Sequence, residues 1–153
     1  MNRKGPWVSH LVEGLGVALV VALAIVVFLQ VFNRYVLKAP ISWTEELAML
    51  LFQWVAFLGA AVGVKRMSHF GIDLVTRTLR PPAARLARLI ILALMACVAL
   101  TMVVEGARVL GLTRSEMYTT MPFSHAWAYT AIPVGGALAL YYLVQHAVRV
   151  WKD

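Results

Sequence analysis

Charged residues are scarce in this sequence. Lys, Arg, Asp and Glu make up 14% of its 153 residues, whereas hydrophobic residues make up 61%. A soluble domain has about 25% charged and about 45–50% apolar residues, and a chain this short keeps much of its surface in water. The composition therefore excludes an ordinary soluble enzyme and a disordered protein, and it predicts an integral membrane protein.

Cysteine and acidic residues are also few. The single cysteine, Cys97, permits no internal disulfide, which excludes a secreted disulfide scaffold. Seven Asp and Glu stand against 14 Lys and Arg, for a net charge of +7. In a soluble protein this surplus would suggest a nucleic-acid partner. Here we expect no nucleic acid, because basic residues collect on the cytoplasmic side of membrane spans.

Four apolar stretches are long enough to cross a bilayer, which takes about 20 helical residues. They cover about 11–32, 47–64, 89–104 and 126–144. The first is longer than the apolar part of a signal peptide, so we expect a retained helix. Pro133 in the fourth predicts a kink rather than a break, because neighbouring helices can satisfy the freed carbonyl. The predicted fold is a single all-α membrane domain over residues 1–153.

The basic residues predict the orientation of these spans. The two termini and the middle connection contain ten of them: Arg3, Lys4, Lys65, Arg66, Arg77, Arg80, Arg85, Arg88, Arg149 and Lys152. The first and third connections contain four: Arg34, Lys38, Arg108 and Arg114. Since basic residues favour the cytoplasmic side, both termini are expected in the cytoplasm.

The first connection ends in two adjacent carboxylates, Glu45 and Glu46. Ser42 followed by Glu45 fits a capping box at the start of the second span. Alternatively, Glu46 belongs to a polar stripe that continues to Gln53 at helical spacing, with Trp43 at its start. A glutamine within a span is costly unless it faces protein, so this stripe is predicted to meet a partner helix. Both interpretations remain open.

The middle connection has a polar stripe with helical periodicity, formed by Arg66, His69, Asp73, Arg77 and Arg80. It predicts an amphipathic helix over about 66–80, lying in the membrane interface against phospholipid headgroups, with Lys65 at its start. A solvated loop is the alternative. His69 and Asp73 lack a third metal ligand nearby, and the chain has no catalytic motif, so we expect no metal, no cofactor and no enzymatic activity.

Small residues recur at the spacing that lets membrane helices approach closely. Gly59 and Gly63 form a GxxxG pair in the second span, and the first and fourth spans also have small faces. The pattern predicts a compact bundle. It leaves open whether Gly59 and Gly63 pack within the chain or against a partner.

Four sequence stretches together resemble a known family. They are NRYV at 33–36, ISWTEEL at 41–47, WVAFLGAA at 54–61 and KRMSHFGID at 65–73. Their order and spacing are similar to those of the small membrane subunit, of DctQ type, of tripartite ATP-independent periplasmic (TRAP) transporters. The motif-bearing part covers about 28–74, and the remainder resembles the family only in hydropathy, length and span count.

The resemblance implies a bacterial inner-membrane system in which an ion gradient, typically of sodium, drives uptake of an organic acid anion. It implies a large membrane subunit that carries the transport site and a periplasmic substrate-binding protein. On this basis Arg34, Trp43 and Glu46 are expected to order the periplasmic side, and Arg66, His69 and Asp73 to fix the interfacial helix.

A rival class is a small four-helix multidrug exporter that works as a homodimer. Glu13, near the start of the first span, would be its proton-exchange site. Its position close to interfacial water, together with the long basic middle connection, argues against this class.

Overall fold

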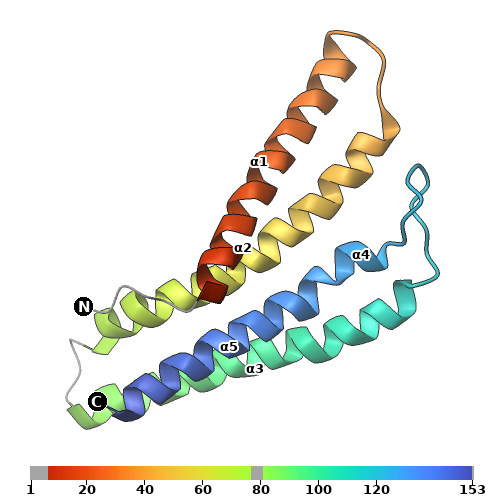
Figure 1. Cartoon of the computed structure of the whole chain (residues 1–153). Helices are drawn as coiled ribbons and strands as arrows, with labels where there is room; N and C mark the ends of the chain where they lie inside the picture. The colour runs from red at the N-terminus through yellow and green to blue at the C-terminus, as the bar shows by residue number, and fades with distance from the viewer. Residues whose placement is uncertain (1–6, 77–80, 153) are drawn as a thin grey trace.

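The computed structural model describes residues 7–76 and 81–152, with backbone alone at 7–9, 67–76, 81, 85 and 149–152. This part of the chain is helical: α1 Trp7–Tyr35, α2 Ser42–Thr76, α3 Pro81–Thr113, α4 Ala126–Tyr129 and α5 Ala131–Lys152 (Figure 1). Four stretches are long and apolar enough to span a membrane: His10–Tyr35, Ser42–Arg66, Pro82–Thr113 and Ala126–Val148. The predicted all-α fold with four spans is confirmed.

The helices form a row rather than a closed bundle. Within the described residues α1 packs against α2 alone, α2 also packs against α5, and α5 packs against α3, with a smaller contact between α2 and α3. Figure 1 shows the α1–α2 pair diverging from the α3–α5 pair towards the end where α4 lies. The prediction of a compact bundle is therefore wrong, because α1 has one neighbouring helix and the rest of its surface is uncovered.

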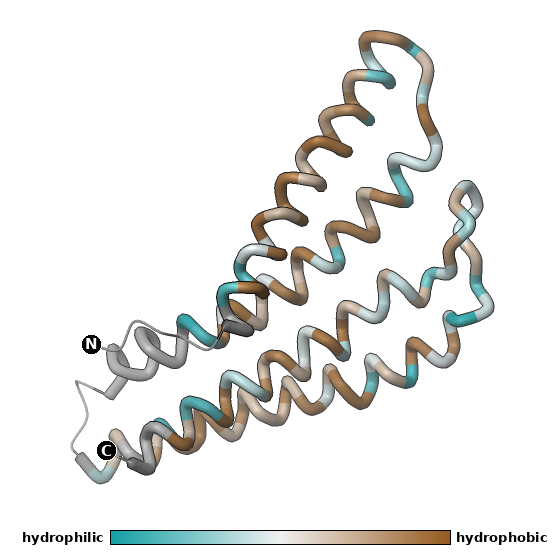
Figure 2. The backbone as a smooth tube through the Cα atoms, in the orientation of Figure 1, coloured by the Kyte–Doolittle hydropathy of each residue, from teal (hydrophilic) through white to brown (hydrophobic). Residues whose placement is uncertain are grey.

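The two outer helices expose most of their apolar surface. Only 6% of the most apolar stretch of α1 is buried, and the same is true of α3, against 33% for the span that contains α5. Large exposed side chains such as Val17, Phe28 and Leu94 lie along these helices. Figure 2 shows the corresponding hydrophobic colouring over nearly the whole length of α1. Lipid or a protein partner must cover these faces, because exposure of so much apolar surface to water is unfavourable.

Glycines on α5 permit the close packing at the centre of the row. A Cβ atom at Gly135 would lie 2.9 Å from the carbonyl oxygen of Phe57 on α2. A Cβ atom at Gly136 would lie 2.9 Å from the carbonyl oxygen of Ala99 on α3. By contrast, a Cβ atom at Gly59 or Gly63 would meet nothing within 4 Å, so neither glycine makes a close helix contact with the described residues.

The fourth span is interrupted at Thr130, between α4 and α5. Pro133 has no N–H to donate to the carbonyl of Tyr129, and its ring crowds that carbonyl. Thr130 keeps helical φ and ψ of −58° and −26°, so the interruption is local and both pieces belong to one span. The expected disturbance is found, but the structure divides the span instead of leaving one kinked helix.

An indole from α2 satisfies a backbone carbonyl beside this interruption. Trp54 Nε1 donates a hydrogen bond to the carbonyl of Trp127 over 3.1 Å. Trp54→Phe is expected to destabilise the fold by about 0.5–1 kcal/mol, the usual range for one hydrogen bond between membrane helices. Thermal unfolding in detergent measures this effect. Trp127→Phe is the matched control, because it keeps the carbonyl and alters only an exposed side chain; equal losses in both variants would contradict the assignment.

The helix ends separate into two groups. Connections 36–41 and 114–125 lie at one end of the molecule, which we call the loop end. The start of α1 and the end of α5 lie towards the other, which we call the terminal end (Figure 1). At the terminal end α2 continues without interruption to Thr76, so residues 66–76 are part of α2 and not a separate helix. The helix can continue this far because no helix-breaking proline occurs in α2, and the next proline in the sequence is Pro81. The amphipathic interfacial helix stays a prediction: the side chains of His69 and Asp73 are not described, and Arg77 and Arg80 lie outside the described residues.

Candidate functional site

The connection between α3 and α4 folds into a short hairpin. Met117 and Ser124 form an isolated antiparallel bridge. The N–H of Tyr118 donates to the carbonyl of Phe123 over 2.9 Å, and the N–H of His125 donates to that of Glu116 over 2.8 Å. The rings of Tyr118 and His125 lie against each other, with centroids 3.9 Å apart. This connection between α3 and α4 is therefore an ordered element.

Two side chains fix the base of the hairpin. The Ser124 hydroxyl lies 3.0 Å from the carbonyl oxygens of both Thr113 and Arg114, and it accepts the N–H of Ala126. Tyr118 is buried, and burial raises the pKa of its phenol, so the phenol stays neutral at ordinary pH. The hairpin is thus tied to the end of α3 and to the start of α4.

Glu46 on α2 holds the tip of the same hairpin. Its carboxylate accepts the N–H of Thr119 over 2.9 Å, the N–H of Thr120 over 3.1 Å and the hydroxyl of Thr120 over 2.5 Å. Hydrogen bonds to a carboxylate are about twice as strong as neutral ones. We call Glu46, Thr119 and Thr120 the Glu46 clamp. It joins the first half of the chain to the hairpin across 73 positions of sequence.

The first turn of α2 differs from the predicted capping box. The helix begins at Ser42 itself, and the Thr44 hydroxyl, which is buried, donates to the carbonyl of Ile41 over 2.6 Å. Glu45 is exposed and makes no hydrogen bond within the described residues. The two adjacent carboxylates thus have different roles, since Glu46 binds the hairpin and Glu45 faces outward.

Large apolar side chains in the first turn of α2 and in the hairpin remain exposed. Trp43 is 44% exposed, Met117 62% and Phe123 48%. Arg34, in the last turn of α1, is exposed as well. We call Arg34, Trp43, Met117 and Phe123 the loop-end rim. A rigid hairpin that presents apolar side chains beside charged ones has the character of a protein-docking surface.

Part of the polar stripe of α2, beyond the exposed Trp43, packs within the chain. Glu46, Gln53 and Phe57 are all partly buried, and the Phe57 backbone lies against Gly135 of α5. The neighbours of this stripe are therefore α4, α5 and the hairpin. The sequence predicted that Gln53 faces protein, but it could not distinguish a helix of this chain from a partner's.

An ion pair joins α1 and α2 nearer the terminal end. Lys65 Nζ lies 2.9 Å from Glu13 Oε1, and the two side chains are 27% and 33% exposed. Lys65 was predicted to meet lipid headgroups, whereas the structure turns it towards α1. The sequence contains a signal for this contact, because Glu13 and Lys65 are opposite charges at the apolar boundaries of consecutive spans.

Exchanging the two charges tests this ion pair. Glu13→Lys and Lys65→Glu, made singly, are each expected to lower the stability by about 1 kcal/mol, and the double variant should regain most of that loss. Thermal unfolding in detergent at low and high salt measures the coupling. If the double variant loses the sum of the single losses, the two charges do not interact.

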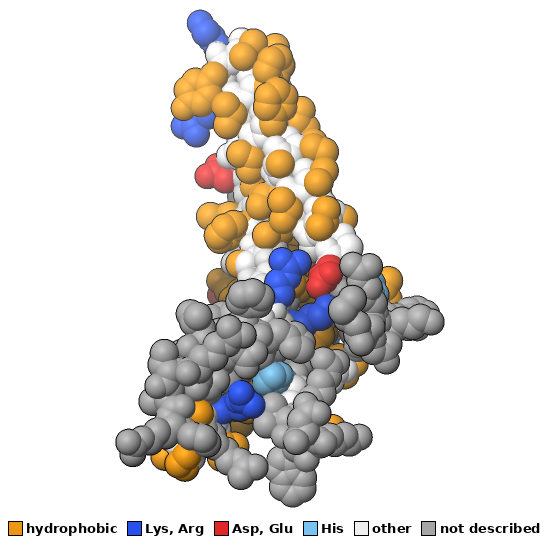
Figure 3. Space-filling view, turned by 90° about the vertical axis from the view of Figure 1, so that its left-hand side faces the viewer, with side chains coloured by type: hydrophobic (Ala, Val, Ile, Leu, Met, Phe, Trp, Pro, Cys, Tyr) orange, Lys and Arg blue, Asp and Glu red, His pale blue; other side chains and the backbone are white. Residues whose placement is uncertain are grey.

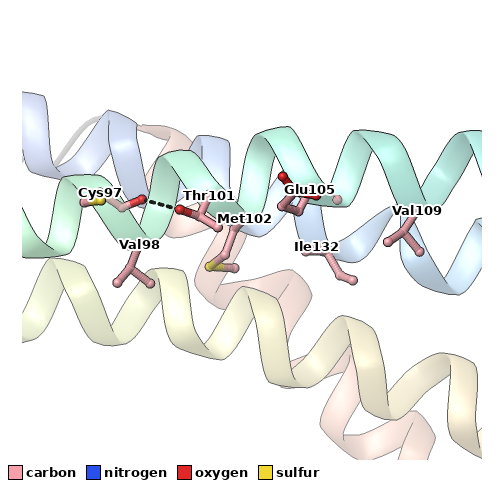
Figure 4. A pocket seen from close by; sticks show the side chains of 8 residues that line it. Cys97, Val98, Thr101, Met102, Glu105, Val109 and Ile132 are labelled. Atoms are coloured by element: carbon pink, nitrogen blue, oxygen red, sulfur yellow. Dashed lines mark hydrogen bonds between the residues drawn. The ribbon is translucent and has the colours of Figure 1, made fainter.

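A shallow hollow on the outer face of α3 has no feature of a substrate site. Its volume is about 390 Å³, and it is lined by residues between Cys97 and Val109 together with Ile132 of α5 (Figure 4). The Thr101 hydroxyl donates to the carbonyl of Cys97 over 2.9 Å, and Glu105 pairs with Arg108 over 2.9 Å. The polar groups of the hollow are therefore already satisfied. The described residues also contain no group of three or more His, Cys, Asp or Glu that could hold a metal ion.

The fold and the loop end define a class of protein. It is a multi-pass helical membrane protein with four candidate spans, broad uncovered apolar faces and an ordered hairpin clamped at one end.

Comparison with known proteins identifies the family. Residues 23–153 match the DctQ component of tripartite ATP-independent periplasmic transporters. The chain is 29% identical over 150 residues to the sialic acid TRAP transporter small permease protein SiaQ of Vibrio cholerae, covering 95% of this chain and 84% of that one. It is 31% identical over 96 residues to the C4-dicarboxylate TRAP transporter small permease protein DctQ of the same species, covering 63% of this chain and 40% of that one.

A longer relative is also similar. The chain is 27% identical over 139 residues to the sialic acid TRAP transporter permease protein SiaT of Haemophilus influenzae, covering 91% of this chain but only 23% of SiaT. The chain belongs to the DctQ family of TRAP transporter small permease subunits. It is a transporter subunit and not an enzyme.

Proposed function

We propose that this chain braces a large membrane transport subunit and supports docking of a periplasmic substrate-binding protein. The complex would use an ion gradient, with sodium as the proposed coupling ion, to import an organic acid anion. We further propose the bacterial inner membrane as its location, with both termini in the cytoplasm. The charge distribution supports that orientation. The two termini and the middle connection contain ten basic residues, and the first and third connections contain four.

One observation carries the bracing role. The four spans lie in a row, and both outer helices leave their apolar faces uncovered. A transport site that opens alternately to the two sides requires helices that enclose a substrate, commonly at the interface between two repeats. A single row of helices offers a flat wall instead, which suits a support for a larger membrane protein.

The docking role rests on the loop-end rim. In the proposed orientation this rim faces the periplasm, where a soluble binding protein would approach. The Glu46 clamp and the Ser124 contacts hold the hairpin in one conformation, which lowers the entropic cost of binding. The names of relatives include both sialic acid and C4-dicarboxylate transporters, so an organic acid anion is the substrate class that we propose.

Co-purification with the large subunit tests the bracing role. The proposed large subunit, co-expressed with this chain, should be retained by the affinity-tagged wild type through detergent extraction and gel filtration. Arg34→Ala and Trp43→Ala are expected to keep the folded chain but to lower complex yield or anion uptake several-fold. Lys38→Ala, an exposed change in the connection between α1 and α2, is the control. Wild-type yield and uptake in both test variants would remove these residues from the docking role.

The exporter alternative has weaker support. A proton-exchange acid must be free to bind and release its proton, whereas Glu13 is held by Lys65 at 2.9 Å. The same alternative gives no role to the ordered hairpin. Loss of drug export in Glu13→Gln, by cells that express this chain alone, would favour the exporter.

A further inference from the structure

A groove runs between α1 and α2 on the side of the molecule away from α5. It has a volume of about 330 Å³. Its walls are formed by Gly16, Val17, Val20 and Val21 of α1 and by Val55, Leu58, Gly59 and Val62 of α2, with Glu13 and Arg66 at one end. A Cβ atom at Gly16 or Gly59 would meet nothing within 4 Å. The two glycines therefore leave space that no other part of the described chain fills.

The mouth of the groove has an unbalanced positive charge. Lys65 lies 2.9 Å from Glu13 and neutralises it. Arg66 is the next residue, is exposed, and lines the groove. The three side chains together have one net positive charge, which matches one phosphate diester. Acidic and basic side chains meet at the lower limit of the hydrophobic surface in Figure 3.

The length of the groove matches one leaflet of a bilayer. The apolar run of α2 ends at Lys65 and Arg66, and a charged side chain at the end of a span reaches the lipid headgroups. From Arg66 to Val55 the helix rises about 16 Å, at 1.5 Å per residue. Half of a hydrocarbon core of about 30 Å is about 15 Å. A chain that starts at the headgroup level would therefore follow the groove to about the midplane of the membrane.

We propose that the α1–α2 groove binds one phospholipid with an anionic headgroup, whose acyl chain lies along Gly16 and Gly59 and whose phosphate pairs with Arg66. A partner's transmembrane helix is about 10–12 Å across with its side chains, so it would insert only single side chains into a hollow of this volume. A single acyl chain is narrow enough. This lipid would fill the space beside α1, the helix with one protein neighbour, and so stabilise its contact with α2.

Lipid titration followed by native mass spectrometry tests the proposal. The purified full chain is titrated with phosphatidylglycerol or with phosphatidylcholine of identical acyl chains. The wild type is expected to bind one phosphatidylglycerol with an affinity about fivefold above that for phosphatidylcholine, the effect of one basic side chain near a lipid surface. Glycerol phosphate, which lacks acyl chains, should not compete at equal concentration.

Variants separate the roles of the acyl chain and the headgroup. Gly59→Leu and Gly16→Leu add a side chain where a Cβ atom meets nothing within 4 Å, and they are expected to lower phosphatidylglycerol affinity about tenfold or more. Gly14→Leu is the matched control, because Gly14 also has open space but does not line the groove. Arg66→Gln should remove the preference for phosphatidylglycerol while leaving residual binding of both lipids, and Arg114→Gln, an exposed change at the loop end, should not.

Three results would overturn the proposal. The first is equal affinity of the wild type for the two lipids. The second is phosphatidylglycerol binding by both groove-filling variants at the level of Gly14→Leu, which would assign the lipid to the general surface. The third is full competition by glycerol phosphate, which would reduce the site to an anion contact at Arg66. Gly16→Leu and Gly59→Leu lie on different helices, so if one variant fails to fold, the other still tests the groove. None of these measurements requires the large subunit.

Discussion

Replacing Gly136 with leucine is expected to prevent correct packing of the fourth span and to cost about 3 kcal/mol or more of stability. A Cβ atom there would lie 2.9 Å from both the Ala99 carbonyl oxygen and Met102 Cβ on α3. Backbone atoms cannot move aside as a flexible side chain can, so overpacking at this position is costly. Because α5 joins α2 to α3, the whole row depends on this contact.

The thermal unfolding midpoint and the monodisperse fraction in detergent measure the effect. Gly14→Leu and Gly111→Leu are matched controls, since a Cβ at either position meets nothing within 4 Å. Alanine variants are expected to change the unfolding midpoint in opposite directions at the two positions. Alanine favours helix by about 1 kcal/mol over glycine, so Gly111→Ala should raise or keep the midpoint. Gly136→Ala should lower it, because its Cβ atom meets α3. Equal midpoints for Gly136→Leu and Gly14→Leu would contradict the packing described.

The second large effect is expected from Glu46→Ala. The carboxylate accepts three donors from Thr119 and Thr120, and hydrogen bonds to a charged group contribute about 1.5–3 kcal/mol. Without them the hairpin tip should open more often, and the Thr119 and Thr120 amides should exchange hydrogen about 10–100-fold faster. Complex yield or anion uptake should also fall in Glu46→Ala, because the hairpin belongs to the proposed docking surface.

Glu45→Ala is the control for this experiment. It removes the same charge from the neighbouring position, where the side chain is exposed and makes no hydrogen bond within the described residues. Hydrogen–deuterium exchange of the hairpin amides distinguishes the two variants. Similar exchange rates in both would mean that Glu46 acts only through its charge and that the clamp does not hold the hairpin.

Hydropathy alone predicted the four spans, because lipid requires long apolar helices that satisfy their own backbone groups. The same pattern did not predict their neighbours. Gly59 and Gly63 formed the clearest small-residue pair, yet Gly135 and Gly136 make the close contacts. An isolated span shows its small faces but not which helix each one meets, so the row could not be distinguished from a compact bundle.

The candidate site shows the same division. Glu46 was identified from its place in a polar stripe and from the family resemblance, but its donors were not, because two of them are backbone N–H groups 73 and 74 positions away. Backbone donors have no signature in the sequence. The ion pair of Lys65 was not predicted, for a related reason: the charge of Lys65 indicated the membrane boundary, while its partner Glu13 was considered only for proton exchange.

Reconstitution of the purified chain into liposomes tests the central claim most directly. Uptake of labelled organic acid anions is measured under an inward sodium gradient, with this chain alone, and with the large subunit and the binding protein added together. The account predicts no uptake above empty liposomes for the chain alone and sodium-dependent uptake for the complete set. Appreciable transport by the chain alone would contradict it.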